Sequence, residues 1–340
     1  MEPLLHNAMR QYMDAVSAFT ALEEAQREAD HVRGGMYWHA GPPSAPEARY
    51  LVRTSPTGGE KSLGPRSPEN DAIFDAFHRR KSAAEDRLAG LKESVKEHQR
   101  LNKALRVGRV DPLVVNIINQ FTRTRLMKHF RVVGTHAVYA YEAEAGVRVI
   151  PSAVATQDID FLWDVRQRVR FSADLKKIDS SMLGVLKKVD PSFRIRQSQK
   201  CTAVNKRGFE VDIIRRQPMD GDAHPIRLSD DEDDFWVAQA VNAHLLMDAP
   251  LFSSVIVSTT GEMARMNTMH PLVFARFKRW MSDLPNRDSK KKERDLLQAR
   301  IVEQMVDEHM PHLRKADIGP ALEPPTEEML AAAPISTGVD

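Results

Sequence analysis

The stretch ATQDIDFLWD, residues 155–164, places two aspartates one position apart inside an otherwise apolar run. Side chains at positions i and i+2 of a β-strand point to the same face, so Asp158 and Asp160 should project side by side. Ile159 and Phe161 would then lie on the opposite, buried face. Taken alone, this pattern is more typical of an ordinary strand with one solvated face than of a metal site, so the surrounding sequence has to decide.

A third acid, Asp212, occurs in FEVDII, residues 209–214, with the same apolar framing. If the two strands are neighbours, three carboxylates converge on one face of a sheet, and their mutual repulsion disfavours the ionisation of each. A divalent cation resolves this conflict, because Mg²⁺ binds carboxylate oxygens together with the phosphates of a substrate. Two such ions can clamp an in-line phosphoryl displacement. Asp158, Asp160 and Asp212 are therefore the predicted catalytic residues and the predicted ligands of Mg²⁺ or Mn²⁺.

RVVGTHAVYAYE, residues 131–142, predicts a strand that turns directly into a helix. Gly134 allows close approach to the backbone at this turn, and Thr135 supplies a hydroxyl where the helix begins. A helix N-terminus presents free N–H groups and a positive dipole end, which suits an anion such as a triphosphate. A Gly-Thr pair by itself is more often a plain helix cap, but the order of Gly-Thr turn, Asp-Ile-Asp strand and later Asp is uncommon by chance.

These residues resemble the signature of the DNA polymerase β-like nucleotidyltransferase superfamily, namely a Gly-Ser turn, an acidic strand and a later third acid. More closely, VVGTHAVYAYEAEAGV, ATQDIDFLWD and FEVDIIRR resemble a bacterial group of nucleotidyltransferase-fold proteins. The resemblance continues through GGMYW, KSLGPRSPE and KKKERDLLQA and covers residues from about 30 to 310. Two features depart from the superfamily pattern: Thr135 replaces the usual serine, and the gap between Gly134 and Asp158 is longer, so an extra turn or strand must fit there.

The resemblance implies a fold, a reaction and a set of partners. Asp158 and Asp160 would hold both metal ions, and Asp212 would hold the catalytic one and help to remove the proton of the attacking hydroxyl. A nucleoside monophosphate would pass from an NTP such as ATP to an acceptor hydroxyl, with an RNA 3′ end or a protein as the favoured acceptor. Toxins and phage-defence factors also occur in this superfamily. The alternative is a non-catalytic module that binds a nucleotide or nucleic acid and regulates a partner.

The expected fold class is α+β: a polymerase β-like core with a mixed sheet and helices, flanked by helical segments. Apolar spacing of three and four predicts helices on either side of a Gly- and Pro-rich stretch that could form a small hairpin. After the core, a capping box at Ser229 and Glu232 predicts a helix start, and the rest is expected to be mostly helical. The predicted parts are an N-terminal helical arm with a β-hairpin, residues 1–110, the core, 111–228, a C-terminal helical domain, 229–318, and a flexible tail, 319–340.

Basic residues near the core are candidates for nucleotide contact. Lys278 is predicted to lie on a helix that follows the core, and Arg215 and Arg216 come directly after the strand that carries Asp212. These residues, with Gly134 and Thr135, are the predicted nucleotide-binding set. The aromatic cluster Tyr37, Trp38 and Tyr50 could stack on unpaired bases, but packing or a homodimer contact is the favoured interpretation.

Bulk composition excludes several classes of protein. A net charge of +2 on 340 residues gives no chain-wide field toward nucleic acid, so electrostatic arguments must be local. A single cysteine, Cys201, excludes a disulfide framework and fits a reducing cytosol. We see no signal peptide and no apolar run near the roughly 20 residues of a membrane span, and therefore expect a cytoplasmic protein without membrane contact.

Overall fold

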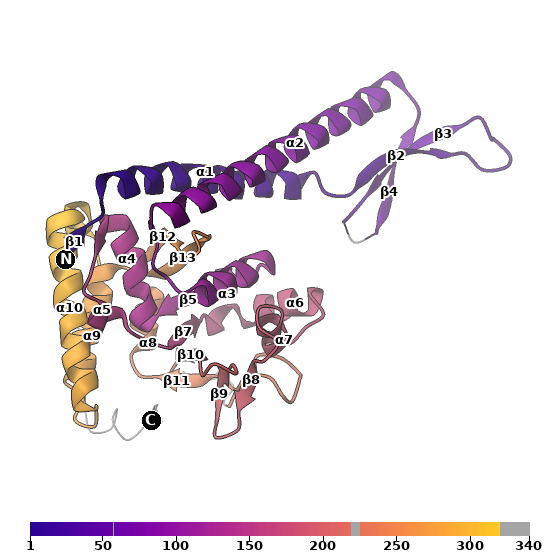
Figure 1. Cartoon of the computed structure of the whole chain (residues 1–340). Helices are drawn as coiled ribbons and strands as arrows, with labels where there is room; N and C mark the ends of the chain where they lie inside the picture. Colours follow the sequence, from indigo (N-terminus) through magenta and orange to yellow (C-terminus); the bar gives the residue numbers. More distant parts are fainter. Residues whose placement is uncertain (57, 219–224, 320–340) are drawn as a thin grey trace. The chain divides into compact units, whose positions relative to one another are not determined.

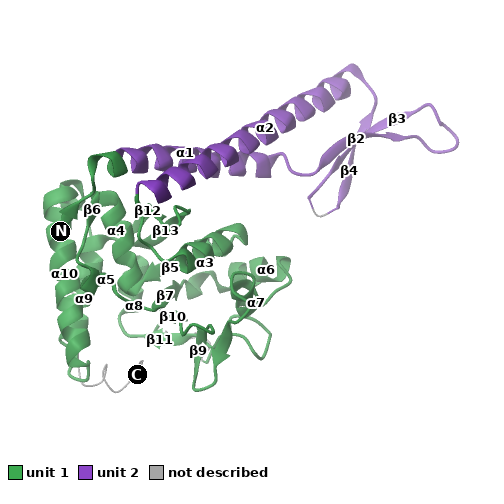
Figure 2. Cartoon of the chain, in the orientation of Figure 1, with its two compact units in different colours: residues 1–9, 106–340 green, residues 10–105 purple. Residues whose placement is uncertain are grey.

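The computed structural model of the chain describes residues 1–56, 58–218 and 225–319. The chain divides into two compact units (Figure 2). The smaller unit comprises residues 10–105, and the larger unit comprises residues 1–9 together with residues 106–340. Each unit is considered by itself below, and the larger one carries the predicted site.

The four-part division stays a prediction. The predicted core, residues 111–228, and the predicted C-terminal domain, residues 229–318, both belong to the larger unit. Of the predicted tail, only residue 319 lies within the described chain. Within the described ranges, no helix combines the length and the apolar character that crossing a bilayer requires.

Two long helices dominate the smaller unit, α1 (His6–His31) and α2 (Pro68–Ala104). They run antiparallel, because Gln11 near the start of α1 donates a hydrogen bond to Asn102 near the end of α2, with a distance of 3.0 Å. Further along, Arg87 of α2 pairs with Glu28 of α1. The two helices that the apolar spacing predicts are therefore both present, and they pack as an antiparallel pair.

Between these helices the chain forms a three-stranded antiparallel sheet, one strand more than the hairpin predicted from the sequence. Its strands are β2 (Gly35–Ala40), β3 (Arg49–Thr54) and β4 (Glu60–Pro65), in that order. Trp38 lies against Phe74 of α2, with ring centroids 5.8 Å apart. This contact supports packing, rather than base stacking, as the role of Trp38.

The larger unit is built on a mixed sheet with the strand order β5-β7-β10-β9-β8, in which β11 also pairs with β10 (Figure 1). The strand β10 is parallel to β7 and β11, and the other pairs are antiparallel. The bounds are β5 (Phe130–Val133), β7 (Asp158–Trp163), β8 (Arg194–Arg196), β9 (Gln199–Val204), β10 (Glu210–Arg216) and β11 (Ala238–Ala240).

One face of this sheet is buried by helix α3 (Pro112–Arg123). Asp111 caps this helix by accepting a hydrogen bond from the Leu113 N–H, and Pro112 fits the first position, where an N–H is not needed. Phe121 of α3 packs on Phe161 of β7, with ring centroids 4.8 Å apart. Because side chains alternate along a strand, Asp158 and Asp160 are left on the other face.

The remaining elements of the larger unit are short, apart from the two C-terminal helices. A small antiparallel pair joins β1 (Glu2–Pro3) to β6 (Val147–Arg148). The helices are α4 (Ala137–Ala145), α5 (Pro151–Val154), α6 (Arg168–Lys177), α7 (Met182–Lys187), α8 (Ala243–Asp248), α9 (Pro271–Ser282) and α10 (Ser289–His309), with 3₁₀ turns η1 (Met127–His129), η2 (Gly134–His136), η3 (Val165–Gln167) and η4 (Pro311–Lys315).

The expectation that the chain is mostly helical after the core is wrong in three places. The first is the strand β11, which pairs with β10 of the core sheet. The second is a β-hairpin formed by β12 (Leu251–Val257) and β13 (Met263–Met269) ahead of α9. The third is the predicted helix start at Ser229, where the structure has no helix. The carboxylate of Asp234 instead accepts hydrogen bonds from the N–H groups of Met182 and Leu183, each at 2.9 Å. Asp234 therefore satisfies N–H groups at the N-terminus of α7, 51 and 52 positions earlier in the chain.

Candidate active site

The three predicted acids converge on one face of the core sheet. Asp160 of β7 lies opposite Asp212 of the parallel neighbour β10, and Asp158 lies opposite Glu210. Ligand oxygens of Asp158, Asp160 and Asp212 lie within 4.8 Å of one another. All three side chains are partly exposed to solvent. The alternation of acidic and apolar residues in both strands is sufficient to produce this arrangement once the strands pair in this register.

Electrostatics make the triad unfavourable without a cation. Burial, followed by the charges of Asp158 and Asp212, raises the pKa of Asp160 well above its usual value. Burial also raises the pKa of Asp212 to about 6, with Asp158 adding to the effect. The hydroxyl of Thr202 donates to Asp212 and opposes this shift. Three oxygen-rich groups at this spacing match the ligand chemistry of Mg²⁺ or Mn²⁺, and a bound divalent ion would relieve the repulsion.

Glycine is required at the turn that faces the triad. Gly134 has φ +67°, and a Cβ built on it would overlap the Oδ2 atom of Asp160. The residue begins the 3₁₀ turn η2 that leads into α4. The longer gap between Gly134 and Asp158 is filled by β6 and α5, which accounts for the extra turn expected there. The backbone of Gly134, in the predicted phosphate-binding turn, is thus in direct contact with the carboxylate of Asp160.

Thr135 faces a partner that the sequence did not reveal. Its side chain is buried, and its Oγ1 accepts a hydrogen bond from Nε2 of Gln298 at 3.2 Å. The same Nε2 donates to the Ala153 carbonyl of α5 at 2.6 Å. Gln298 belongs to α10, 163 positions further along the chain. It therefore fixes the Gly-Thr turn against the C-terminal helix.

Comparison with known proteins supports the same assignment. The sequence model of a nucleotidyltransferase family matches residues 113–320, more than half of the chain. The chain belongs to this nucleotidyltransferase family. Neither the curated proteins nor the solved structures contain a match to it. The matched range includes the core sheet, the Gly134 turn and the whole acidic triad.

In this nucleotidyltransferase, Lys278 belongs to a buried ion cluster whose charge acts on the triad. Its ammonium is 2.7 Å from Asp295 Oδ1, and Asp295 Oδ2 is 2.9 Å from Arg287. Lys278 and Asp295 are almost completely buried. The charges of Lys278 and Arg287 lower the pKa of Asp160, although burial and the neighbouring acids outweigh them. Both cations are therefore within electrostatic reach of the triad, and Asp295 holds them there.

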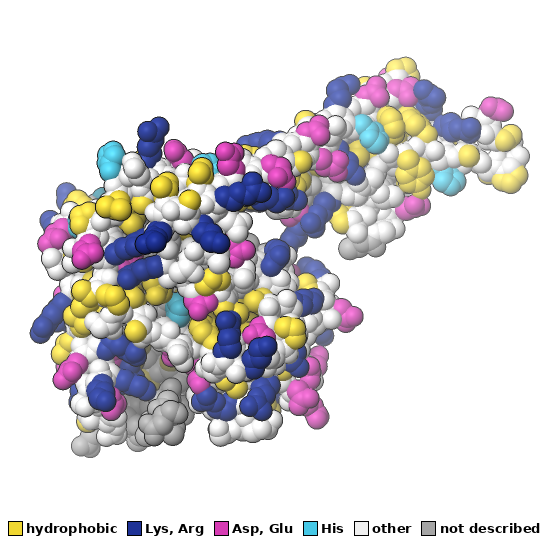
Figure 3. Space-filling model, in the orientation of Figure 1, with side chains coloured by type: hydrophobic (Ala, Val, Ile, Leu, Met, Phe, Trp, Pro, Cys, Tyr) yellow, Lys and Arg dark blue, Asp and Glu magenta, His cyan; other side chains and the backbone are white. Residues whose placement is uncertain are grey.

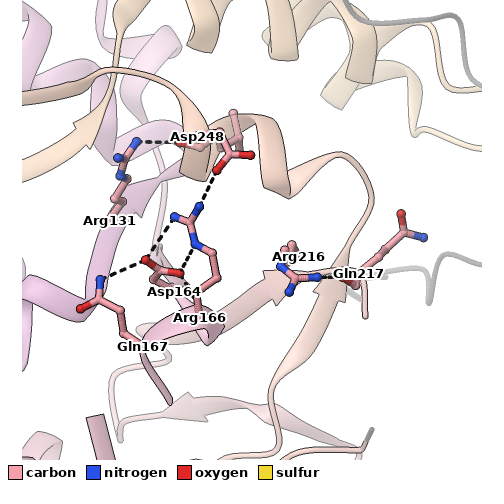
Figure 4. Close-up of polar contacts among 8 residues, drawn as sticks. Arg131, Asp164, Arg166, Gln167, Arg216, Gln217 and Asp248 are labelled. Carbon is pink, nitrogen blue, oxygen red and sulfur yellow. Dashed lines mark hydrogen bonds and ion pairs between the residues drawn. The ribbon is translucent and has the colours of Figure 1, made fainter. Parts of the chain in front are cut away.

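The structure does not bring Arg215 to the triad. Its side chain is fully buried. It lies three positions after Asp212 on β10, so strand alternation directs it to the opposite face of the sheet. Arg216 shares the face of Asp212, is partly exposed, and donates a hydrogen bond to the Gln217 carbonyl at 3.0 Å (Figure 4). Of the two neighbours, Arg216 is the one placed on the triad face.

His136 is a structural residue of the first helical turn rather than a charged ligand. Its ring is buried, and burial lowers its pKa to about 4, against the opposing effect of Asp158. The imidazole is therefore neutral near pH 7.

Asp164, at the far end of the same sequence motif, lies outside the triad. Its carboxylate accepts hydrogen bonds from Arg166 at 2.8 Å and from Gln167 at 3.0 Å (Figure 4). Arg166 also reaches Asp248 at 2.7 Å. The group ties the end of β7 to α8, so Asp164 has a structural role.

Proposed function

We propose that this nucleotidyltransferase uses Mg²⁺ or Mn²⁺ to move a nucleoside monophosphate from an NTP, such as ATP, to an acceptor hydroxyl. The observation that carries the proposal is the convergence of three carboxylates within 4.8 Å, on a sheet face that contacts Gly134. An RNA 3′ end or a protein side chain is the favoured acceptor. The reaction belongs to the cytoplasm, where NTPs and Mg²⁺ are plentiful.

Asp158, Asp160 and Asp212 would hold the metal, which would neutralise charge on the phosphates and acidify the acceptor hydroxyl. The hydroxyl of Thr202 donates to Oδ1 of Asp212 and so orients that carboxylate. With the metal bound, the Asp212 carboxylate would be deprotonated, and it would be placed to accept the proton of the attacking hydroxyl. The new bond joins the acceptor oxygen to the α-phosphorus, the bond from that phosphorus to the bridging oxygen breaks, and pyrophosphate leaves.

The phosphate-binding side is proposed to combine the Gly134 turn with nearby cations. The turn offers backbone at the point closest to Asp160. Lys278 and Arg287 add positive charge behind the triad, and Arg216 adds it on the open face. Positioning and charge neutralisation of this kind supply most of the catalysis in phosphoryl transfer.

The test is transfer of label from each α-labelled NTP to total RNA, to added protein and to the enzyme itself, with Mg²⁺ or Mn²⁺. Asp158→Ala and Asp212→Ala should each reduce transfer by at least about a hundredfold, because the metal site is lost. Asp230→Ala is the matched control, since Asp230 has a 98% exposed side chain outside the site. Full activity in either triad variant would rule out the metal assignment. NTP binding without transfer to any of these acceptors, and without pyrophosphate release in the presence of small molecules, would favour the regulatory alternative. Pyrophosphate release that requires a small molecule would instead identify that molecule as the acceptor.

A growth-arresting role as a toxin or defence factor is a further part of the proposal, supported by the superfamily resemblance. Transfer of a nucleotide to a shared RNA end or protein would block the function of that acceptor. Induced expression of the wild type should then arrest growth, and expression of Asp158→Ala to the same level should not. Equal growth of the two cultures would rule out the growth-arresting role. It would not bear on nucleotidyl transfer, which the labelling assay tests separately.

A further inference from the structure

The core has one strongly basic edge. Residues 187–216 contain nine Lys and Arg but three Asp and Glu, whereas the whole chain has 49 basic and 47 acidic residues. This segment includes the edge strand β8, the strand β9 and the turn into β10. Figure 3 shows Lys and Arg side chains gathered on the part of the larger unit where β8 and β9 lie. This excess of basic residues is confined to one segment, so the net charge of the whole chain does not reveal it.

Strand register places part of this charge on the same face as the triad. Arg194 of β8 lies opposite Val204 of β9, Val204 lies opposite Glu210 of β10, and Glu210 lies opposite Asp158 of β7. Residues directly opposite each other on neighbouring strands share a face of the sheet. Arg194 is therefore on the triad face, about 10 Å from β10 across two strand spacings.

Lys200 reaches the same face by the same rule. Thr202 lies opposite Asp212, and Lys200 is two positions before Thr202 on β9. Lys206 and Arg207 occupy the turn between β9 and β10, next to the end of β10 that carries Glu210. We call Arg194, Lys200, Lys206 and Arg207 the basic edge; all four are exposed.

The charges of the basic edge are available to a partner. Arg194, Lys200 and Lys206 form no ion pair with any other residue that the structure describes. Their neighbour Arg196 differs, because its guanidinium pairs with Glu210. Exposed cations gathered on one edge of a sheet produce a combined field that attracts polyanions and is screened by salt.

The kind of partner follows from what the surface lacks. Protein interfaces have an apolar and aromatic centre. Here the two aromatic rings of the segment, Phe193 and Phe209, are buried, and its exposed charged groups are cations. A row of exposed Lys and Arg without an apolar centre suits a phosphate backbone, which is bound mainly through counterion release. One triphosphate needs fewer cations than two strands and a turn provide.

We propose that the basic edge binds the backbone of a single-stranded RNA and presents its 3′ hydroxyl to Asp212. The inference rests on the proposed nucleotidyl transfer and narrows its acceptor to RNA. The RNA crosses β8 and β9 on the triad face, and its terminal nucleotide reaches β10. Because the contacts are to phosphates, binding is independent of base sequence and weakens steeply with salt.

Binding is measured first, with labelled single-stranded RNA of mixed sequence, Mg²⁺ and no NTP, so that it does not depend on transfer. Arg194→Glu/Lys200→Glu should raise Kd by at least about tenfold and reduce the slope of log K against log salt by about 1.4, or about 0.7 per lost phosphate contact. Lys206→Glu/Arg207→Glu lies in a turn, tests the same edge without altering a strand, and should weaken binding similarly. Arg168→Glu/Arg170→Glu is the control: it makes the same charge change at exposed positions of α6, beyond the other end of β7.

Transfer assays then separate this inference from the proposed function. Asp212→Asn should bind RNA but not extend it, and the two basic-edge variants should lose extension in proportion to binding. If RNA is extended normally by both basic-edge variants while Asp212→Asn is inactive, the RNA surface is refuted and the proposed function stands. Label found on protein, with unchanged yield in the basic-edge variants, also refutes it. If RNA binding needs the basic edge but the wild type labels no acceptor, the proposed function fails and the surface survives as an RNA-binding site.

Discussion

Asp160 and Asp212 lie directly opposite each other on the parallel strands β7 and β10, and both have a pKa above the usual aspartate value. An acid whose pKa is higher in the folded state stabilises the fold below its unfolded pKa, about 3.9, and that contribution is lost as pH rises through the folded pKa. For Asp212 the folded pKa is about 6, and the folded pKa of Asp160 is shifted in the same direction.

The metal-free protein should therefore become less stable as pH rises from about 4 through about 6 and beyond. Because the carboxylates are partly exposed, we expect a loss of about 1 kcal/mol from this source. Denaturant unfolding in chelator across this range measures it. Asp212→Asn removes one of the repelling charges, so its stability should fall less over the same range. A parallel pH dependence of the wild type and Asp212→Asn would contradict the coupled triad.

Divalent cations should reverse the effect, since the ligands must be deprotonated to bind them. Mg²⁺ or Mn²⁺ is expected to stabilise the wild type by about 1–3 kcal/mol near pH 8 and by much less near pH 5. Thermal unfolding with and without the cation is the measurement, and it requires no substrate. Asp160→Asn should abolish the stabilisation at both pH values, whereas Asp230→Asn, at an exposed position outside the site, should keep it.

Gly134→Ala offers a test of the contact between the turn and the triad. Gly134 and Gly208 both have positive φ, but a Cβ overlaps Asp160 at Gly134 and meets nothing within 4 Å at Gly208. Each alanine variant should lose about 1 kcal/mol through backbone strain alone. Gly134→Ala should in addition displace the Asp160 carboxylate and lose the Mg²⁺ stabilisation that Gly208→Ala retains. Equal Mg²⁺ responses in the two variants would show that the turn does not constrain the triad.

The parts of the site that sequence could predict are those set by local geometry. The positions of Asp158 and Asp160 follow from the alternation of a strand, and the Gly134 turn follows from a strand that runs into a helix. The separation of α9 from α10 around Pro285 also follows from local chemistry. Even Arg215 could have been excluded, because a residue three positions after Asp212 on a strand must face the other way.

The rest depends on which elements pack together. Asp295 looks like an ordinary exposed helix acid in the run KKKERD, but the packing of α10 on α9 buries it against Lys278. Gln298 contacts Thr135 across 163 positions. Asp234 lies in an acidic run that suits a new helix, but its carboxylate caps α7, 51 and 52 positions earlier. None of these contacts leaves a periodic signal in the sequence.

The buried pair of Lys278 and Asp295 gives a prediction with a control on the same two helices. Asp295→Ala leaves Lys278 buried without its partner and should cost about 3–5 kcal/mol. Arg279 of α9 and Glu303 of α10 form a second pair, but both side chains are partly exposed. Glu303→Ala should therefore cost less than about 1 kcal/mol. Denaturant unfolding of both variants measures the difference, and similar costs would contradict the role of burial.

A double variant separates the structural role of this pair from the proposed phosphate contact of Lys278. Replacing a buried ion pair by apolar residues of similar size is often neutral in stability. Lys278→Met/Asp295→Leu should thus recover most of the stability lost in Asp295→Ala, since Arg287 is partly exposed and can turn toward water. If Lys278 supplies charge to the triphosphate, the double variant should bind a non-hydrolysable NTP at least about tenfold more weakly than the wild type, even though its stability is restored. Wild-type NTP affinity in a stable double variant would restrict Lys278 to holding α9 against α10.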